Sequence, residues 1–183
     1  MVDAGVAHPP AGPFPPHYRA APVAPGTADL ATGPAMAPAQ FDAAWELGAD
    51  EARAAVAAGF RLLIAGEMGI GNTTASACIT HALTGVDADT ATGSGAGADA
   101  AMRERKRAIV QQAVARLNGA RDKAALAAIA GFEIVAMAGF YAAGAAEGVA
   151  YPRPASGRRP RGPDPPGRPA AALRRDLHIG AEP

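Results

Sequence analysis

A glycine-dense stretch at 66–74 has the residue types of an anion-binding loop. Glycine lets a phosphate reach backbone N–H groups that a Cβ would shield, and a helix starting directly after the loop adds its dipole. Gly66, four residues and Gly71 nearly match the loop of nucleotide triphosphatases, but that motif requires Lys where this chain has Asn72. Because a γ-phosphate would lack its countercharge, the favoured ligand is a phosphate monoester. A tight turn without a ligand is the alternative.

Two charged residues near glycine-rich stretches are candidates for chemistry. Glu67 lies inside the first loop, where a carboxylate would repel a phosphate unless it faces another group, such as a sugar hydroxyl. Lys106 lies in a basic run, 103–107, that follows a second glycine-rich stretch at 92–97. Cations at the start of a helix oppose its dipole, which favours a role in neutralising a phosphate. For both residues, a solvated surface side chain is the alternative.

The remaining reactive residue types point to no further site. Cys78 is predicted to be a small core residue on the helix after the loop, rather than a nucleophile. The four histidines show no metal-ligand spacing.

The elements around the first loop must position these residues. Apolar residues at near-helical spacing predict a helix over 40–58, and a second helix is expected over 73–83. Between them, the apolar run 60–65 has the length of a buried strand that leads into the loop. This order is typical of an α/β fold with a parallel sheet and flanking helices.

The other segments complete the predicted organisation. Residues 1–7 are a candidate short strand within a proline-rich, extended N-terminal region. Further helices are expected over 99–117, 122–130 and 132–147, the last one buried. Residues 152–175 hold seven arginines, one acid and almost no apolar side chains, so we expect the tail at 152–183 to be disordered.

Composition limits the class of protein. The 183 residues suffice for one domain, and the net charge of zero gives no basic field for nucleic acid. A single cysteine excludes an internal disulfide and suits the cytoplasm. The stretch 124–150 is rich in Ala and Gly and contains Glu133, so we expect no membrane span.

Taken together, several segments closely resemble nicotinate-nucleotide–dimethylbenzimidazole phosphoribosyltransferases, which assemble the lower ligand of cobalamin. The resemblance covers about residues 1–150. Its segments are, in order, Val2–Ala7, Ala24–Thr27, Gly33–Met36, Gly66–Thr74 (GEMGIGNTT), Thr92–Gly97, Arg105–Arg107 and Gly131–Ile134. It implies a Rossmann-like three-layer α/β domain over 1–151, a homodimer as is typical of the family, and neither a metal nor a cofactor.

The resemblance also implies a reaction and its site. The phosphoribosyl group of nicotinate mononucleotide would move to 5,6-dimethylbenzimidazole, giving α-ribazole 5′-phosphate and nicotinate. Glu67 would lie near the ribose and the leaving group as the candidate catalytic residue. The substrate-binding residues would be Gly69, Ile70, Gly71, Asn72 and Thr73 around the 5′-phosphate, Lys106 as its countercharge, and Gly93, Ser94, Gly95 and Gly97 along the nucleotide pocket.

This chain departs from the family pattern in two respects. The general-base glutamate of the family lies in a later part of a chain about twice this long, and it has no counterpart here. After about residue 150 the family sequence gives way to an Arg/Pro-rich run, typical of a shifted reading frame. We therefore expect a partial chain that binds a nucleotide phosphate weakly and does not turn over. The rivals are another phosphate-handling enzyme with a P-loop-like turn, and a non-catalytic binding module or pseudogene product without a stable fold.

Overall fold

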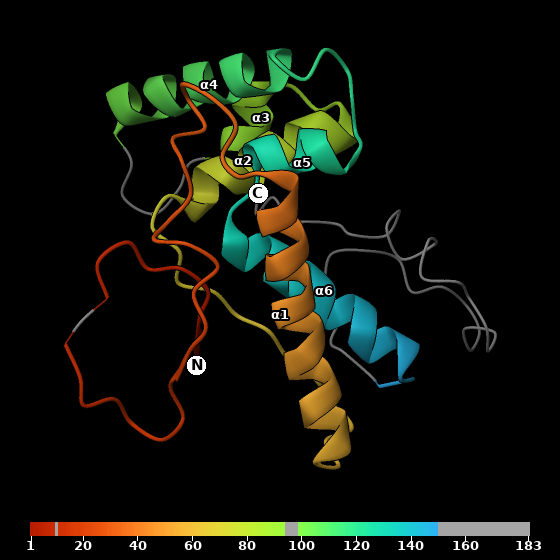
Figure 1. Cartoon of the computed structure of the whole chain (residues 1–183). Coiled ribbons are helices and arrows are strands. Elements are labelled where there is room, and N and C mark those ends of the chain that lie inside the picture. The colour runs from red at the N-terminus through yellow and green to blue at the C-terminus, as the bar shows by residue number, and fades with distance from the viewer. Residues whose placement is uncertain (10, 94–98, 150–183) are drawn as a thin grey trace.

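The structure is a computed structural model that describes residues 1–9, 11–93 and 99–149. Over these residues the chain is mostly helical, with a small parallel sheet (Figure 1). The strands are β1 (Val2–Asp3) and β2 (Arg19–Ala20). The helices are α1 (Pro38–Ala57), α2 (Asn72–Thr84), α3 (Ala88–Thr92), α4 (Ala100–Ala115), α5 (Lys123–Ile129) and α6 (Phe132–Ala146).

The five helices predicted from the sequence are confirmed, with ends that differ by a residue or two. Their starts are encoded locally. Pro38 occupies the first turn of α1, where its missing N–H costs nothing. Asp99 and Asp122 cap α4 and α5, and each carboxylate accepts a hydrogen bond from the backbone N–H three residues on, at 2.7 and 2.9 Å. The short helix α3 has no counterpart among the predicted elements, although Asp87 caps it in the same way.

The predicted buried strand over 60–65 is wrong. Apart from an isolated bridge at Leu62, this segment forms no strand among the described residues. Phe60, Leu62 and Ile64 are 61%, 56% and 69% exposed, whereas Leu63 is buried. A strand needs a hydrogen-bonded neighbour from elsewhere in the chain, and an apolar run does not supply one. The sheet formed by the described residues is the two-stranded pair β1–β2, and the three-layer arrangement stays a prediction.

The N-terminal region is held by that sheet and by one buried carboxylate. The strand expected over 1–7 is confirmed as β1, which pairs in parallel with β2 in the register Val2 with Arg19. Asp3 accepts hydrogen bonds from the N–H groups of Gly5 and Val6 and from the Tyr18 hydroxyl, at 2.8–2.9 Å. Burial by itself would raise the pKa of Asp3, but these three hydrogen bonds outweigh it and lower the pKa.

The most extensive helix contact joins α1 and α6, which cross side by side in Figure 1. Glycine makes this approach possible. A Cβ on Gly48 of α1 would lie 1.7 Å from the carbonyl oxygen of Ala136, and one on Gly139 of α6 would lie 2.1 Å from that of Trp45. The helix predicted to be buried packs closely on α1, and its residues are buried or half-buried apart from Ala146.

The main core lies between α1, α2, α4, α5 and α6 and is built largely from alanine. Cys78 is fully buried in it, as predicted. No helix in the described residues is long and apolar enough to cross a membrane. Nor do these residues contain a cluster of three or more His, Cys, Asp or Glu side chains suited to a metal ion. The tail at 152–183 lies outside the described residues.

Candidate functional site

The first glycine-rich loop leads from the extended segment 60–65 into α2. Gly71 is the residue that turns the chain into the helix. Its φ of +81° lies in the left-handed region, which glycine adopts without strain. Its carbonyl oxygen accepts hydrogen bonds from the N–H groups of Thr74 and Ala75, at 3.0 and 3.4 Å. The helix therefore starts at Asn72, directly after the last glycine.

The loop and the first turn of α2 present unsatisfied donors. Within the described part of the chain, the backbone N–H groups of Ile70, Gly71 and Thr73 donate to no acceptor. The first N–H groups of a helix have no partner inside the helix, and they carry the positive end of its dipole. The first turn of α2 contains no acidic residue of its own. This arrangement suits an anion.

Lys106 is brought to the same place by the packing of α4 against α2. Its half-buried side chain donates a hydrogen bond to the Thr73 hydroxyl, with 3.0 Å between Nζ and Oγ1. The structure thus places the predicted countercharge beside the loop, although 33 residues separate the two in sequence. Its role in binding phosphate stays a prediction.

Glu67 folds back onto its own loop. Its Oε2 accepts a hydrogen bond of 2.6 Å from the backbone N–H of Gly69, and the side chain is exposed. The carboxylate therefore occupies one of the amides that the sequence assigned to the phosphate. Its catalytic role stays a prediction.

Glu133 is the site residue that sequence reasoning missed. It lies in the first turn of α6, and its Oε1 accepts a 2.9 Å hydrogen bond from the Asn72 side-chain amide. A Cβ built on Gly69 would lie 3.0 Å from the Glu133 carboxyl carbon, so the carboxylate packs directly against the loop. The available signal was an acid at the start of an otherwise apolar helix, in the segment Gly131–Ile134.

The second glycine-rich loop is described only in part. Gly93 ends α3, and its φ of +57° again lies in the left-handed region that favours glycine. Among the described residues, no hydrogen bond joins Gly93 to the first loop. Ser94, Gly95 and Gly97, which the sequence assigned to the nucleotide pocket, lie outside the described residues.

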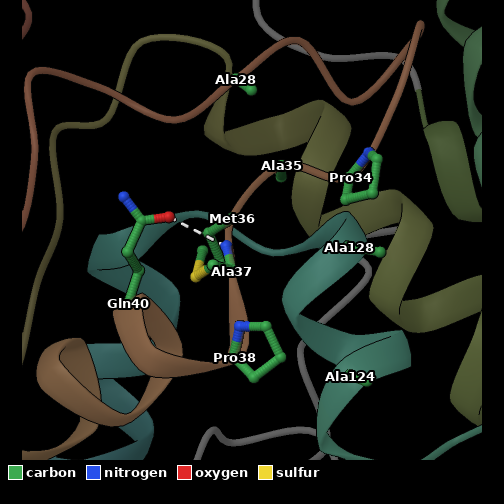
Figure 2. A pocket seen from close by; sticks show the side chains of 9 residues that line it. All are labelled: Ala28, Pro34, Ala35, Met36, Ala37, Pro38, Gln40, Ala124 and Ala128. Carbon is green, nitrogen blue, oxygen red and sulfur yellow. Dashed lines mark hydrogen bonds between the residues drawn. The ribbon is translucent and has the colours of Figure 1, made fainter.

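A shallow pocket of about 580 Å³ lies where α1 begins beside α5 (Figure 2). Its lining is small and apolar apart from Gln40, whose Oε1 accepts a hydrogen bond from the Ala37 N–H at 2.9 Å. The lining residues are Ala28, Pro34, Ala35, Met36, Ala37, Pro38, Gln40, Ala124 and Ala128. None of the predicted site residues belongs to this set.

Comparison with known proteins gives a consistent result. A family model described as a phosphoribosyltransferase matches residues 1–151. A nicotinate-nucleotide–dimethylbenzimidazole phosphoribosyltransferase of Thermus thermophilus is 43% identical over 128 residues, which are 69% of this chain. Its Azotobacter vinelandii counterpart is 42% identical over 152 residues, or 81% of this chain. A crystal structure of CobT from Thermus thermophilus aligns over 82% of this chain with a TM-score of 0.76 and 42% identity.

These relatives are considerably longer than the present chain. The matched region amounts to 38% of the Thermus protein and 43% of the Azotobacter protein. It covers 45% of the Thermus crystal structure. The chain therefore spans about two fifths of the length of the relatives it matches.

Proposed function

The chain belongs to the phosphoribosyltransferase family, and on this premise we propose that its glycine loop binds the phosphoribosyl group of nicotinate mononucleotide. The acceptor of that group, in a protein of family length, is 5,6-dimethylbenzimidazole. The products are α-ribazole 5′-phosphate and nicotinate, and the reaction belongs to cobalamin synthesis.

The observation that carries this proposal is the convergence of donors at the start of α2. The unsatisfied N–H groups of Ile70, Gly71 and Thr73 and the Lys106 ammonium group come from two helices and one loop. A phosphate monoester has the charge and the acceptor oxygens to satisfy all four donors. Asn72 in place of the P-loop lysine argues against a nucleoside triphosphate.

The transfer itself requires attack by the base, departure of nicotinate and removal of a proton. An imine nitrogen of the benzimidazole attacks the anomeric carbon while the bond to the nicotinate nitrogen breaks and its electron pair leaves with nicotinate. The benzimidazole N–H proton must then pass to a carboxylate. Glu67 is the candidate carboxylate at the loop, whereas the resemblance places the family's general-base glutamate in a part of the family sequence that this chain does not match. We therefore propose that this chain binds the nucleotide and does not catalyse transfer by itself.

Two measurements on the purified chain test the proposal. Titration with nicotinate mononucleotide, followed by calorimetry, should show saturable binding that inorganic phosphate competes away, while ATP should bind no better than phosphate. Incubation with both substrates should yield no α-ribazole phosphate by chromatography. Absence of nucleotide binding would refute the binding proposal. Turnover at the rate of a family-length enzyme would refute the expected lack of catalysis, and tight ATP binding would favour the P-loop rival.

The family resemblance also supports proposals on domain organisation, architecture, oligomeric state and location. We propose that residues 1–151 form one α/β unit, that a protein of family length builds the three-layer arrangement, and that it is a cytoplasmic homodimer. Light scattering of the purified chain measures its oligomeric state directly, and limited proteolysis with mass spectrometry locates the end of the protected unit.

A further inference from the structure

Helix α6 holds the glycine loop at both of its ends. At the entry, the backbone N–H of Ala65 donates to the Tyr141 hydroxyl at 3.1 Å. At the exit, the Asn72 side-chain amide donates to Glu133 Oε1 at 2.9 Å. Glu133 and Tyr141 are separated by eight residues, a little over two turns, so they lie along one side of the helix.

The Glu133 carboxylate fills a space that glycines leave open. A Cβ on Gly131 would lie 2.3 Å from Glu133 Oε1, and one on Gly69 would lie 3.0 Å from the same oxygen. Neither position tolerates a side chain while the carboxylate stays in place. The half-buried carboxylate is therefore enclosed between the start of its own helix and the loop.

Asn72 is held on both sides of its amide. Its Nδ2 donates to Glu133, and its Oδ1 accepts a 3.1 Å hydrogen bond from the Ser76 hydroxyl one turn further along α2. These two hydrogen bonds together orient the side-chain amide at the first residue of α2. A negative charge this close to a phosphate site opposes anion binding, so the presence of the carboxylate calls for another role, and its contact with Asn72 offers one.

We propose that Glu133 is a positioning residue, which acts through Asn72 to hold the exit of the loop in the conformation that binds phosphate. The part of this inference that concerns phosphate rests on the proposed function. The contact with Asn72 does not. The geometry requires an oxygen acceptor at the reach of Glu133, and it does not require the charge.

Two substitutions separate the reach of the Glu133 side chain from its charge, and a third is the control. Glu133→Gln keeps an acceptor oxygen at the same reach and loses the charge, so phosphate affinity should stay within about threefold of the unsubstituted chain. Glu133→Asp keeps the charge but cannot reach Asn72, so the affinity for inorganic phosphate should fall about tenfold. Glu147→Gln, an exposed acid at the other end of α6, is the matched control and should change nothing.

Binding of inorganic phosphate to the full 183-residue chain is measured by calorimetry, and the Asn72 side-chain amide is followed by NMR without ligand. The amide resonances should shift in Glu133→Asp and stay nearly unchanged in Glu133→Gln. Asn72→Ala should remove the effect of Glu133→Asp on binding, since the pathway is then already broken. Circular dichroism shows which variants fold. If Glu133→Asp does not fold, phosphate binding is compared between Glu133→Gln and Asn72→Ala.

The outcomes are distinguishable. Tighter phosphate binding in Glu133→Gln together with unchanged binding in Glu133→Asp would mean that the residue acts only by its charge, which overturns the proposal. Unchanged Asn72 resonances in Glu133→Asp would overturn it as well. An unsubstituted chain that binds no phosphate would refute the proposed function, and the Asn72 resonances would still decide whether Glu133 positions the loop.

Discussion

The ammonium group of Lys106 is the one fixed positive charge that the described structure places against the glycine loop. The Glu67 carboxylate already accepts a hydrogen bond from the backbone N–H of Gly69, and the Glu133 carboxylate accepts one from the Asn72 side-chain amide. Charges of both signs therefore meet around one short loop, and each is held by a specific donor or acceptor. Binding of an anion depends on which of them faces it.

Replacing Lys106 with alanine should weaken phosphate binding by about tenfold to a hundredfold, because hydrogen bonds to charged groups contribute about 1.5–3 kcal/mol. Arg105→Ala removes the same charge from an exposed neighbour on α4 and serves as the control. Calorimetric titration with inorganic phosphate measures both. An equal loss in the two variants would mean that net charge, rather than the contact of Lys106 with Thr73, governs binding.

Cys78 reports on whether the chain folds. Burial raises the pKa of its thiol to about 12, against a smaller opposing effect of the Arg116 charge. We expect no reaction with Ellman's reagent at about pH 8 until urea is added, because the thiol is protonated and shielded. Rapid labelling of Cys78 without urea would support the alternative that the chain has no stable fold.

The same shift gives a pH dependence. The folded pKa lies above the ordinary value of 9.0, so folding opposes ionisation of Cys78. The contribution of the protonated Cys78 thiol to the free energy of unfolding is therefore complete below about pH 9 and is lost as the pH rises toward about 12. Urea midpoints measured from about pH 8 to about pH 10.5 should decline in the unsubstituted chain. The decline should be smaller in Cys78→Ala, and equal declines would contradict the assignment.

At the scale of elements, the crossing of α1 and α6 depends on two glycines. Alanine at Gly48 would place a methyl group 1.7 Å from a backbone oxygen that cannot move aside without moving α6. Overpacking of this kind typically costs about 1–3 kcal/mol and sometimes more, well above the gain of about 1 kcal/mol in helix propensity. Urea unfolding followed by circular dichroism should show a loss of about 3 kcal/mol for Gly48→Ala.

Gly144→Ala is the matched comparison on α6. Its new methyl group would meet the end of the flexible Leu63 side chain at 2.8 Å, which can rotate away. We expect a loss of about 1 kcal/mol or less, since the propensity gain offsets the adjustment. A Gly144 variant as unstable as the Gly48 variant would show that backbone contact is not what limits the crossing.

At the scale of the whole molecule, the segment 60–70 leaves apolar side chains in contact with water. Leu63 packs on α6 with Ala52 and Val149, whereas Phe60, Leu62 and Ile64 are more than half exposed. Met68 and Ile70 in the adjoining loop are almost fully exposed. Large apolar patches of this kind drive self-association.

Replacing Leu62 and Ile64 together with serine should reduce binding of an apolar fluorescent dye and reduce light scattering, with little change in the urea midpoint, because both side chains are already exposed. Leu63→Ser, on the buried side of the same segment, should lower stability by about 2–4 kcal/mol through loss of packing. Dye binding unchanged by the double substitution would show that the segment is covered in solution.

Helix positions were predictable from the sequence because the hydrogen bonds of a helix join residues four apart, so that periodicity and caps such as Asp99 and Asp122 carry the information locally. The glycine loop and the family were predictable for the same reason, since GEMGIGNTT is contiguous. Anion binding by the loop stays a prediction. Only the tertiary structure decided what depends on distant partners. Among the described residues it shows no strand over 60–65, and it brought Lys106 to Thr73 and Glu133 to Asn72, the latter across 61 residues. Helix packing determines such contacts, and no local pattern encodes them.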